Sequence, residues 1–422
     1  MRARPRLLRL VAVVALVTAA VVAVGTGPAV AQATCGFDEP TGVVTITLAA
    51  NLPATVVRSG DTITLDGQAC GTATVANTDQ ILVSGAGAGA EEDFTIDLSG
   101  GAFAPGKTAE TDPDGEIEFQ VTLGDAATLL IAGGTGNDAI TAGVAGVNMN
   151  AAEATDDPDV TITGSPTVSL SGRDGADTLS IAGGDGTGEG VTEAVVDGGA
   201  GDDTLIGRLG GSTLTGGDGV DTLDYSGADT ITADLSTGVV QPGVGLVDFV
   251  GSSENVIGTS GDDAITGDGA ANSLLGGDGD DVLDGGKGDD ELDGGNGTDT
   301  ASFTSSRKAV TVDLRSGSAE GHGADTLTGI ENVEGSRRGD ELTGDGVANR
   351  LNGGDGDDQI QGRGKGDLVL GGRGDDILSG NDGRDTLDGA AGRDQLDGGK
   401  AKDTCIPGKD ADAWTNCETV KL

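Results

Sequence analysis

The clearest pattern of apolar and polar positions runs through residues 258–302 and 335–406. An aliphatic residue recurs every nine positions in Gly- and Asp-rich segments such as GGDGDDVLD from Gly276 and GGRGDDILS from Gly371. The ends of these units, VLD and ILS, predict short strands, and the glycines predict tight turns. With one inward residue per nine, two units form one flattened coil of 18 residues. The aliphatic side chains then stack between two short parallel sheets, at Leu283, Leu292, Ile360, Leu378, Leu387 and Leu396.

Weaker copies of the unit precede these runs. Three lie between Gly198 and Asp224, and single copies begin at Gly133 and Gly172. They predict a degenerate solenoid over residues 133–224.

Residues 225–257 and 303–334 alternate apolar and polar positions instead (TITADL, VTVDL), and this predicts inserted strands. The two stretches belong to one duplicated block. DTLDYSGADTITADLSTG from Asp221 matches DTASFTSSRKAVTVDLRSG from Asp299, and the offset over the block is 77 to 78 residues. We expect each insertion to form a solenoid coil of different cross-section.

The two ends of the chain differ from the array. Residues 34–132 contain short alternating segments such as VVTITLAA and EIEFQVTL, which predict an irregular β-helix or a small sandwich. Residues 407–422, which include Trp414, predict a cap, because a solenoid must cover its open core. The predicted fold is all-β, a parallel β-roll with an N-terminal irregular β-helix or small β-domain.

The first 33 residues have the layout of a secretory signal peptide. A basic start (Arg2, Arg4, Arg6, Arg9) precedes an apolar stretch from Leu10 to Val24, and Ala31-Gln32-Ala33 offers a cleavage site. The apolar run is shorter than the roughly 20 residues that span a bilayer. We therefore expect cleavage after Ala33 and a secreted, extracellular or cell-wall-associated product.

Composition narrows the classes of partner. The chain has 79 Gly, 70 acidic and 24 basic residues, a formal net charge of −46 and 2% aromatics. Nucleic acid and anionic membranes need a positive surface, so both are excluded as partners. The charge is either solvated, as in a disordered acidic chain, or neutralised by bound cations. The regular spacing of the aliphatic residues favours cations, because a disordered chain needs no such spacing.

The four cysteines form two local pairs, Cys35 with Cys70 and Cys405 with Cys417. Outside the cell such pairs usually oxidise, so two disulfides are predicted. The second would close a short loop and contribute about 3 kcal/mol on the chain-entropy argument. A zinc site is excluded, since the spacing is wrong and His322 is the only histidine.

The nine-residue unit also carries chemistry. Gly at positions 1, 2 and 4 permits backbone angles that aim carbonyl oxygens inward, and Asp at position 6 adds a carboxylate. A flexible cage of several oxygen ligands favours Ca²⁺ over Mg²⁺. The unit G-G-x-G-x-D-x-U-x resembles the RTX, or hemolysin-type, calcium-binding nonapeptide repeat. In that family each ion lies between turns of successive coils on the same edge.

The resemblance implies a set of ligands. Some units depart from the pattern, such as GDGAANSLL from Gly267, which lacks the Asp at position 6, so several ions are expected but not one per unit. The implied carboxylates are Asp203, Asp221, Asp263, Asp281, Asp290, Asp299, Asp358, Asp367, Asp376, Asp385 and Asp394. The implied glycines, at positions 1 and 4, are Gly276, Gly279, Gly285, Gly288, Gly353, Gly356, Gly371 and Gly374.

No enzyme is predicted. The chain has neither H-E-x-x-H nor G-x-S-x-G, and we expect His322 to be solvated in a loop. The first hypothesis is a secreted calcium-binding protein with a structural role at the cell surface or in a matrix, its folding stabilised by calcium. The alternative is an extracellular polysaccharide-active enzyme of β-helix type with an RTX tail. Beside calcium, a cell-wall or matrix polysaccharide or protein is the expected partner.

Overall fold

The computed structural model describes residues 32–85, 91–103, 117–149, 158–184, 187, 189–208, 210–243 and 245–421. The predicted signal peptide, residues 1–33, lies outside this part except for its last two residues. One compact unit, Ala33–Leu422, holds all the described strands. Its one described helical element is a single 3₁₀ turn, η2 (Leu98–Gly100).

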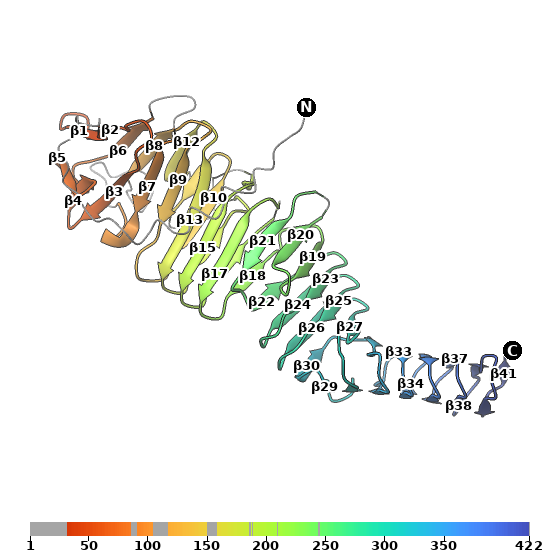
Figure 1. Ribbon diagram of the computed structural model, residues 1–422. Helices are drawn as coiled ribbons and strands as arrows, with labels where there is room; N and C mark the ends of the chain where they lie inside the picture. Colours follow the sequence, from red (N-terminus) through yellow and green to blue (C-terminus); the bar gives the residue numbers. More distant parts are fainter. Residues whose placement is uncertain are drawn as a thin grey trace, which may run out of the picture. The chain divides into compact units, whose positions relative to one another are not determined.

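Two long, mostly parallel sheets line the two sides of the unit, and successive coils stack along it (Figure 1). The first sheet, here called sheet A, contains β1 (Thr34–Asp38), β2 (Val43–Thr47), β6 (Gln80–Ser84), β8 (Glu118–Thr122), β10 (Ala139–Gly143), β11 (Gly146–Asn148), β12 (Val160–Thr163), β14 (Thr178–Ser180), β16 (Thr204–Ile206), β18 (Thr222–Asp224), β22 (Asn255–Ile257), β24 (Ser273–Asp278), β26 (Glu291–Asn296), β28 (Thr311–Asp313), β29 (Ser318–Glu320), β30 (Ala324–Thr328), β32 (Glu341–Thr343), β34 (Gln359–Gly364), β36 (Ile377–Asp382), β38 (Gln395–Asp397) and β40 (Ala413–Thr415).

Sheet B faces sheet A across the core. It contains β3 (Ala54–Ser59), β4 (Thr62–Leu65), β5 (Gln68–Thr74), β7 (Asp93–Asp97), β9 (Thr128–Ala132), β13 (Thr167–Asp174), β15 (Val195–Ala200), β17 (Thr213–Asp218), β19 (Ile231–Asp234), β20 (Val239–Pro242), β21 (Asp248–Gly251), β23 (Ala264–Thr266), β25 (Val282–Asp284), β27 (Thr300–Ser302), β31 (Asn332–Glu334), β33 (Arg350–Asp355), β35 (Leu368–Arg373), β37 (Thr386–Ala391), β39 (Thr404–Ile406) and β41 (Thr419–Val420).

Of the two predicted folds for residues 34–132, an irregular β-helix or a small sandwich, the described part of this region forms the β-helix. β2, β6, β8 and β12 pair in parallel in sheet A, while β3, β7, β9 and β13 pair in parallel in sheet B. β13 then pairs with β15, so the same two sheets continue into the roll. Larger side chains fill these wider coils. Phe94 and Phe119 are buried, and the ring of Phe119 meets that of Phe103 edge to face at 5.1 Å.

In the roll the predicted 18-residue coil is confirmed. Leu274 aligns with Leu292 in sheet A, and Val369 aligns with Leu387 in sheet B. All four side chains are buried. Each strand contributes one aliphatic residue, so the core is a single column of side chains on each side. This is why leucine recurs every nine residues and why few aromatic residues are needed.

Each inserted stretch forms an antiparallel hairpin that widens one coil. β19, β20 and β21 make the first in sheet B, and β28, β29 and β30 make the second in sheet A. The duplicated block therefore begins in opposite sheets. Asp221 precedes β18 of sheet A, whereas Asp299 precedes β27 of sheet B.

Both predicted disulfides are present, one at each end of the unit. Cys35–Cys70 joins β1, which pairs antiparallel with β2, to β5. Cys405–Cys417 ties the last coil to β39. Trp414 aligns with Leu396 at the end of the sheet A column and remains 42% exposed. Residues 407–421 thus form the end of the solenoid.

Candidate metal centres

The position-6 aspartates stand in columns, each directly before a strand. The backbone N–H of one donates to Oδ1 of the next, one coil later. The distances are 2.8 Å for Asp281 to Asp299, for Asp358 to Asp376 and for Asp367 to Asp385. One carboxylate oxygen of each residue is therefore fixed by the backbone of the preceding coil.

The other oxygen, Oδ2, has no such partner. In 12 of these aspartates it is buried and accepts no hydrogen bond from the described residues. Orphaned buried acceptors are costly, and a regular set of them points to a ligand. The set is Asp177, Asp203, Asp221, Asp281, Asp290, Asp299, Asp358, Asp367, Asp376, Asp385, Asp394 and Asp403.

Main-chain carbonyl oxygens lie beside several of these atoms. A Cβ added to Gly276, the first residue of its unit, would overlap Oδ2 of Asp281 and lie 2.7 Å from the carbonyl oxygen of Gly294. A Cβ on Gly198 would meet Oδ2 of Asp203 and the carbonyl oxygen of Gly216 in the same way. Carboxylate and carbonyl oxygens from successive coils therefore line one small space. Such a space suits a hard cation such as Ca²⁺.

The raised pKa values of these aspartates also favour a bound cation. Burial, with smaller contributions from neighbouring carboxylates, raises the pKa of Asp203, Asp281 and Asp290 to about 6. It raises the pKa of Asp358 to about 7. These carboxylates are poorly solvated and crowded by like charge, and a bound cation would offset both effects.

Backbone shape separates these turns from the rest. In each of the 12 turns whose Asp has an unpartnered Oδ2, the residue at position 2 of the nine-residue unit has a positive φ, for example 120° at Gly277 before Asp281. We call them open turns. Glycine occupies most of these positions, because φ in this region is strained for other residues. The position-2 residues are Arg173, Gly199, Gly217, Gly277, Gly286, Gly295, Gly354, Arg363, Gly372, Asn381, Ala390 and Gly399.

Five turns have the other form. Here the position-2 residue lacks a positive φ, and its N–H donates to the position-6 side chain, as from Thr259 to Oδ2 of Asp263 at 2.6 Å. We call these closed turns. Their position-6 residues are Asp138, Asp263, Asn272, Asp340 and Asn349.

Two closed turns replace the carboxylate by an amide. Nδ2 of Asn272 donates to the carbonyl oxygen of Glu254 at 2.7 Å, and Nδ2 of Asn349 donates to that of Glu331 at 3.0 Å. The amide hydrogen thus satisfies a carbonyl of the preceding coil without an ion.

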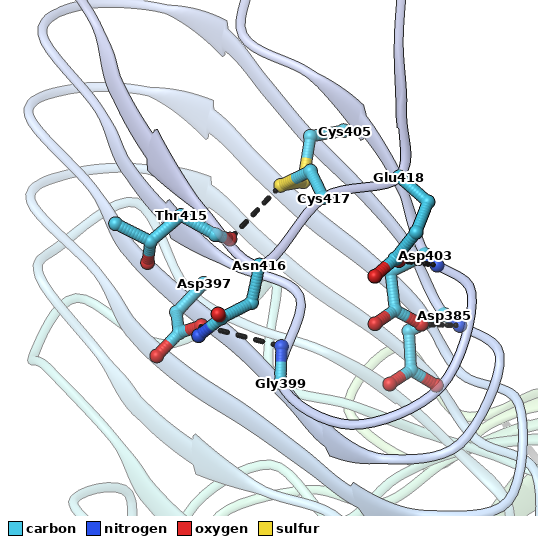
Figure 2. Close-up of a disulfide and its surroundings, with 9 residues drawn as sticks. All are labelled: Asp385, Asp397, Gly399, Asp403, Cys405, Thr415, Asn416, Cys417 and Glu418. Carbon is cyan, nitrogen blue, oxygen red and sulfur yellow. Dashed lines mark hydrogen bonds between the residues drawn. A yellow bond between two sulfur atoms is a disulfide. The ribbon is translucent and has the colours of Figure 1, made fainter.

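These N–H to Oδ1 hydrogen bonds link the position-6 residues of successive coils into five continuous series, which we call ladders. Each ladder begins at a closed turn. Each ends on a further carboxylate, as where the N–H of Asp403 donates to Oε2 of Glu418 at 2.8 Å beside the Cys405–Cys417 disulfide (Figure 2). The other terminal carboxylates are those of Glu254, Glu331, Asp325 and Asp412.

Ten of the eleven predicted carboxylates lie in open turns. The eleventh, Asp263, lies in a closed turn, where its Oδ1 accepts from the N–H of Ile231 at 2.6 Å. Both of its oxygens already have donors, so its role as a ligand stays a prediction that this geometry disfavours. Sequence reasoning omitted Asp177 and Asp403, although their units, GRDGADTLS and GGKAKDTCI, place Asp at position 6. The predicted glycines at position 4 have positive φ, as at Gly279 with 121°. Those at position 1 do not, and glycine is needed there because a Cβ, as on Gly285 or Gly353, would overlap the Asp of its own unit.

No cluster of three or more His, Cys, Asp or Glu side chains forms a metal site within the described residues.

The comparisons with known proteins concern the same segments. The model of the RTX calcium-binding nonapeptide repeat matches residues 197–231, 251–283, 266–301, 334–369, 343–378 and 370–405. No curated protein matches the chain. The matched segments of the roll, between residues 197 and 405, are therefore RTX calcium-binding nonapeptide repeats.

Proposed function

We propose that the protein is a secreted structural component of a cell surface or extracellular matrix whose roll folds on binding calcium. One observation carries the calcium-dependent folding: among the described residues, 12 buried carboxylate oxygens accept no hydrogen bond, and several of them lie beside carbonyl oxygens of the next coil. Without cations, the roll holds this row of poorly solvated charges and many glycines, which lose much entropy on ordering. Binding of calcium supplies the missing free energy of folding.

Several features support an extracellular setting. The chain contains two disulfides, which persist in oxidising compartments. Extracellular calcium modules bind with Kd values of about 10⁻⁴ to 10⁻³ M, and we expect weak, cooperative sites in this range. In the described part of the chain, no helix has the length and apolar character to cross a membrane.

We propose that the role requires no catalysis. A long stack of coils with a disulfide at each end suits a spacer or scaffold. The alternative, a polysaccharide-active enzyme, predicts turnover of acidic polysaccharides in calcium that a point change in the N-terminal half abolishes.

Circular dichroism and calorimetry test the proposal. The chain beginning at Thr34 is measured without calcium and during titration with it. We expect strand signal over the roll to appear cooperatively with calcium. Strand signal that is the same in metal-free buffer and in calcium would contradict calcium-dependent folding.

A further inference from the structure

A cavity of about 450 Å³ lies where four neighbouring strands of sheet B end. β19, β23, β25 and β27 pair in parallel on successive coils. The turn after each contributes to the lining, and His322 enters from the loop between β29 and β30. The lining includes the side chains of Ser236, Thr266, Lys287, Ser305, Arg307, Lys308 and His322.

The lining concentrates positive charge in a chain of net charge −46. Lys287, Arg307 and Lys308 are exposed, and none forms an ion pair with a described carboxylate. Elsewhere on the roll some cations are paired, as in Lys400 with Asp382 at 2.8 Å, whereas others, such as Arg315, form no ion pair with a described carboxylate. Three unpaired cations around one cavity create a local positive potential that attracts an anion.

Two acidic side chains lie at the cavity, and each accepts a hydrogen bond through one carboxylate oxygen. Asp268 is part of the lining, and its Oδ1 accepts the N–H of Ala270 at 2.8 Å. Asp284 lies nearby, and its Oδ1 accepts the hydroxyl of Ser305 at 3.0 Å.

His322 differs from the sequence-based expectation of a solvated residue. It is half-buried in this cavity, and its Nδ1 is buried without a hydrogen-bond partner among the described residues. Burial, the largest influence, lowers its pKa, so the ring is neutral near pH 7. A neutral imidazole can donate to or accept from a ligand hydroxyl.

We propose that this cavity binds an acidic saccharide, a sugar that carries a carboxylate or sulfate group. The three cations pair with the anionic group, and Ser236, Thr266 and His322 offer hydrogen bonds to sugar hydroxyls. The volume lies in the usual range for small-molecule sites, about 300–1,000 Å³, and exceeds what an inorganic anion fills. This site is separate from the open turns and goes beyond the proposed calcium function.

The test compares two variants of equal charge change in the calcium-loaded full chain. The cavity variant is Lys287→Gln with Arg307→Gln and Lys308→Gln. The control is Arg208→Gln with Arg315→Gln and Lys421→Gln, three exposed cations that lie outside both the cavity and the open turns. Calorimetry at low salt uses trigalacturonate, glucose 6-sulfate, neutral maltotriose and inorganic sulfate. Circular dichroism verifies that both variants fold.

We expect at least one acidic sugar to bind the unmodified and control chains alike, and the cavity variant about tenfold or more weakly, since each exposed charge contributes modestly. Maltotriose should not bind. His322 is the only histidine, so its ring signal in NMR of an untagged chain should move on binding.

Any of three results would overturn the assignment. The first is that neither acidic sugar binds. The second is that the control variant loses as much affinity as the cavity variant, and the third is that inorganic sulfate binds as tightly as the sugars, which would make this a simple anion site. Failure here leaves calcium-dependent folding untouched, because that is read from strand signal alone.

Discussion

Asp281 and Asp299 lie one coil apart, and the backbone N–H of Asp281 donates to Oδ1 of Asp299 at 2.8 Å, while Oδ2 of each is buried and accepts no hydrogen bond from any residue that the structure describes. Each carboxylate is thus held by one oxygen and presents the other. We propose that a cation between the coils would bind the free oxygens of the open turns, and that the closed turns, whose position-6 side chains already accept backbone hydrogen bonds, hold no ion.

The two turn types predict different calcium stoichiometries. Asp281→Asn removes a carboxylate from an open turn, so we expect one ion fewer or about tenfold weaker binding at that site. Asp263→Asn changes a closed turn whose oxygens accept backbone hydrogen bonds, so the number of ions should stay the same even if stability falls. Calorimetric titration of both variants measures this. Equal loss of ions in both would mean that the turn types do not differ in binding.

Backbone shape at position 2 should matter for stability. Gly277 has φ of 120°, and a Cβ there would overlap the carbonyl oxygen of Thr259. We expect Gly277→Ala to cost about 1–3 kcal/mol in free energy of unfolding in calcium, because the strain falls on backbone atoms. Gly269→Ala is the matched control, since no atom lies within 4 Å of its added Cβ, and its effect should stay within about 0.5 kcal/mol. Urea unfolding compares the two, and equal effects would refute the argument.

Stability without calcium should depend on pH in an unusual direction. The pKa of Asp281 is about 6 and that of Asp358 about 7 in the folded chain, against a usual 3.8. Between pH of about 4 and 7 the folded state therefore binds more protons than the unfolded state. The free energy of unfolding then falls as pH rises through this range. We expect more strand signal in circular dichroism at pH 5 than at pH 7.5 in metal-free buffer. Calcium should narrow or reverse this difference, because it binds the deprotonated form. Strand signal that rises with pH in metal-free buffer would contradict the prediction.

A buried pair at the first hairpin offers another test. The hydroxyl of Tyr225 donates to Oδ2 of Asp248 at 2.8 Å, and both side chains are fully buried. Tyr225→Phe leaves that oxygen unpaired and should cost about 1–3 kcal/mol. A double-mutant cycle with Asp248→Asn separates the hydrogen bond from packing. Additive effects of the two changes would show that the pair contributes nothing of its own.

The C-terminal disulfide should protect the last ladder. Cys405→Ala with Cys417→Ala removes a short-loop crosslink worth about 3 kcal/mol on the chain-entropy argument. Because Glu418 fixes the N–H of Asp403, we expect faster hydrogen exchange over residues 403–421 and loss of the last calcium site. Exchange at β33 and β35 should remain unchanged. Cys35→Ala with Cys70→Ala is the matched control, which should leave the C-terminal exchange unaltered.

The sequence by itself determined the repeating part of this protein. The nine-residue spacing of Leu283 and Leu292 predicted the coil, because each strand holds one inward side chain. The positions of Asp and Gly predicted ten of the carboxylates that lie in open turns, and the cysteine pairs predicted both disulfides. These features depend on residue types at fixed spacings along the chain, so the sequence pattern alone predicts them.

Only the tertiary structure decided the rest. Whether a turn is open or closed depends on φ at position 2 and on donors from another coil, as Ile231 shows for Asp263. Likewise, the cavity gathers Ser236, Lys287 and His322 from turns far apart in the sequence. Stacking brings such residues together only after the hairpins have set which coil follows which, and no pattern along the chain contains that information.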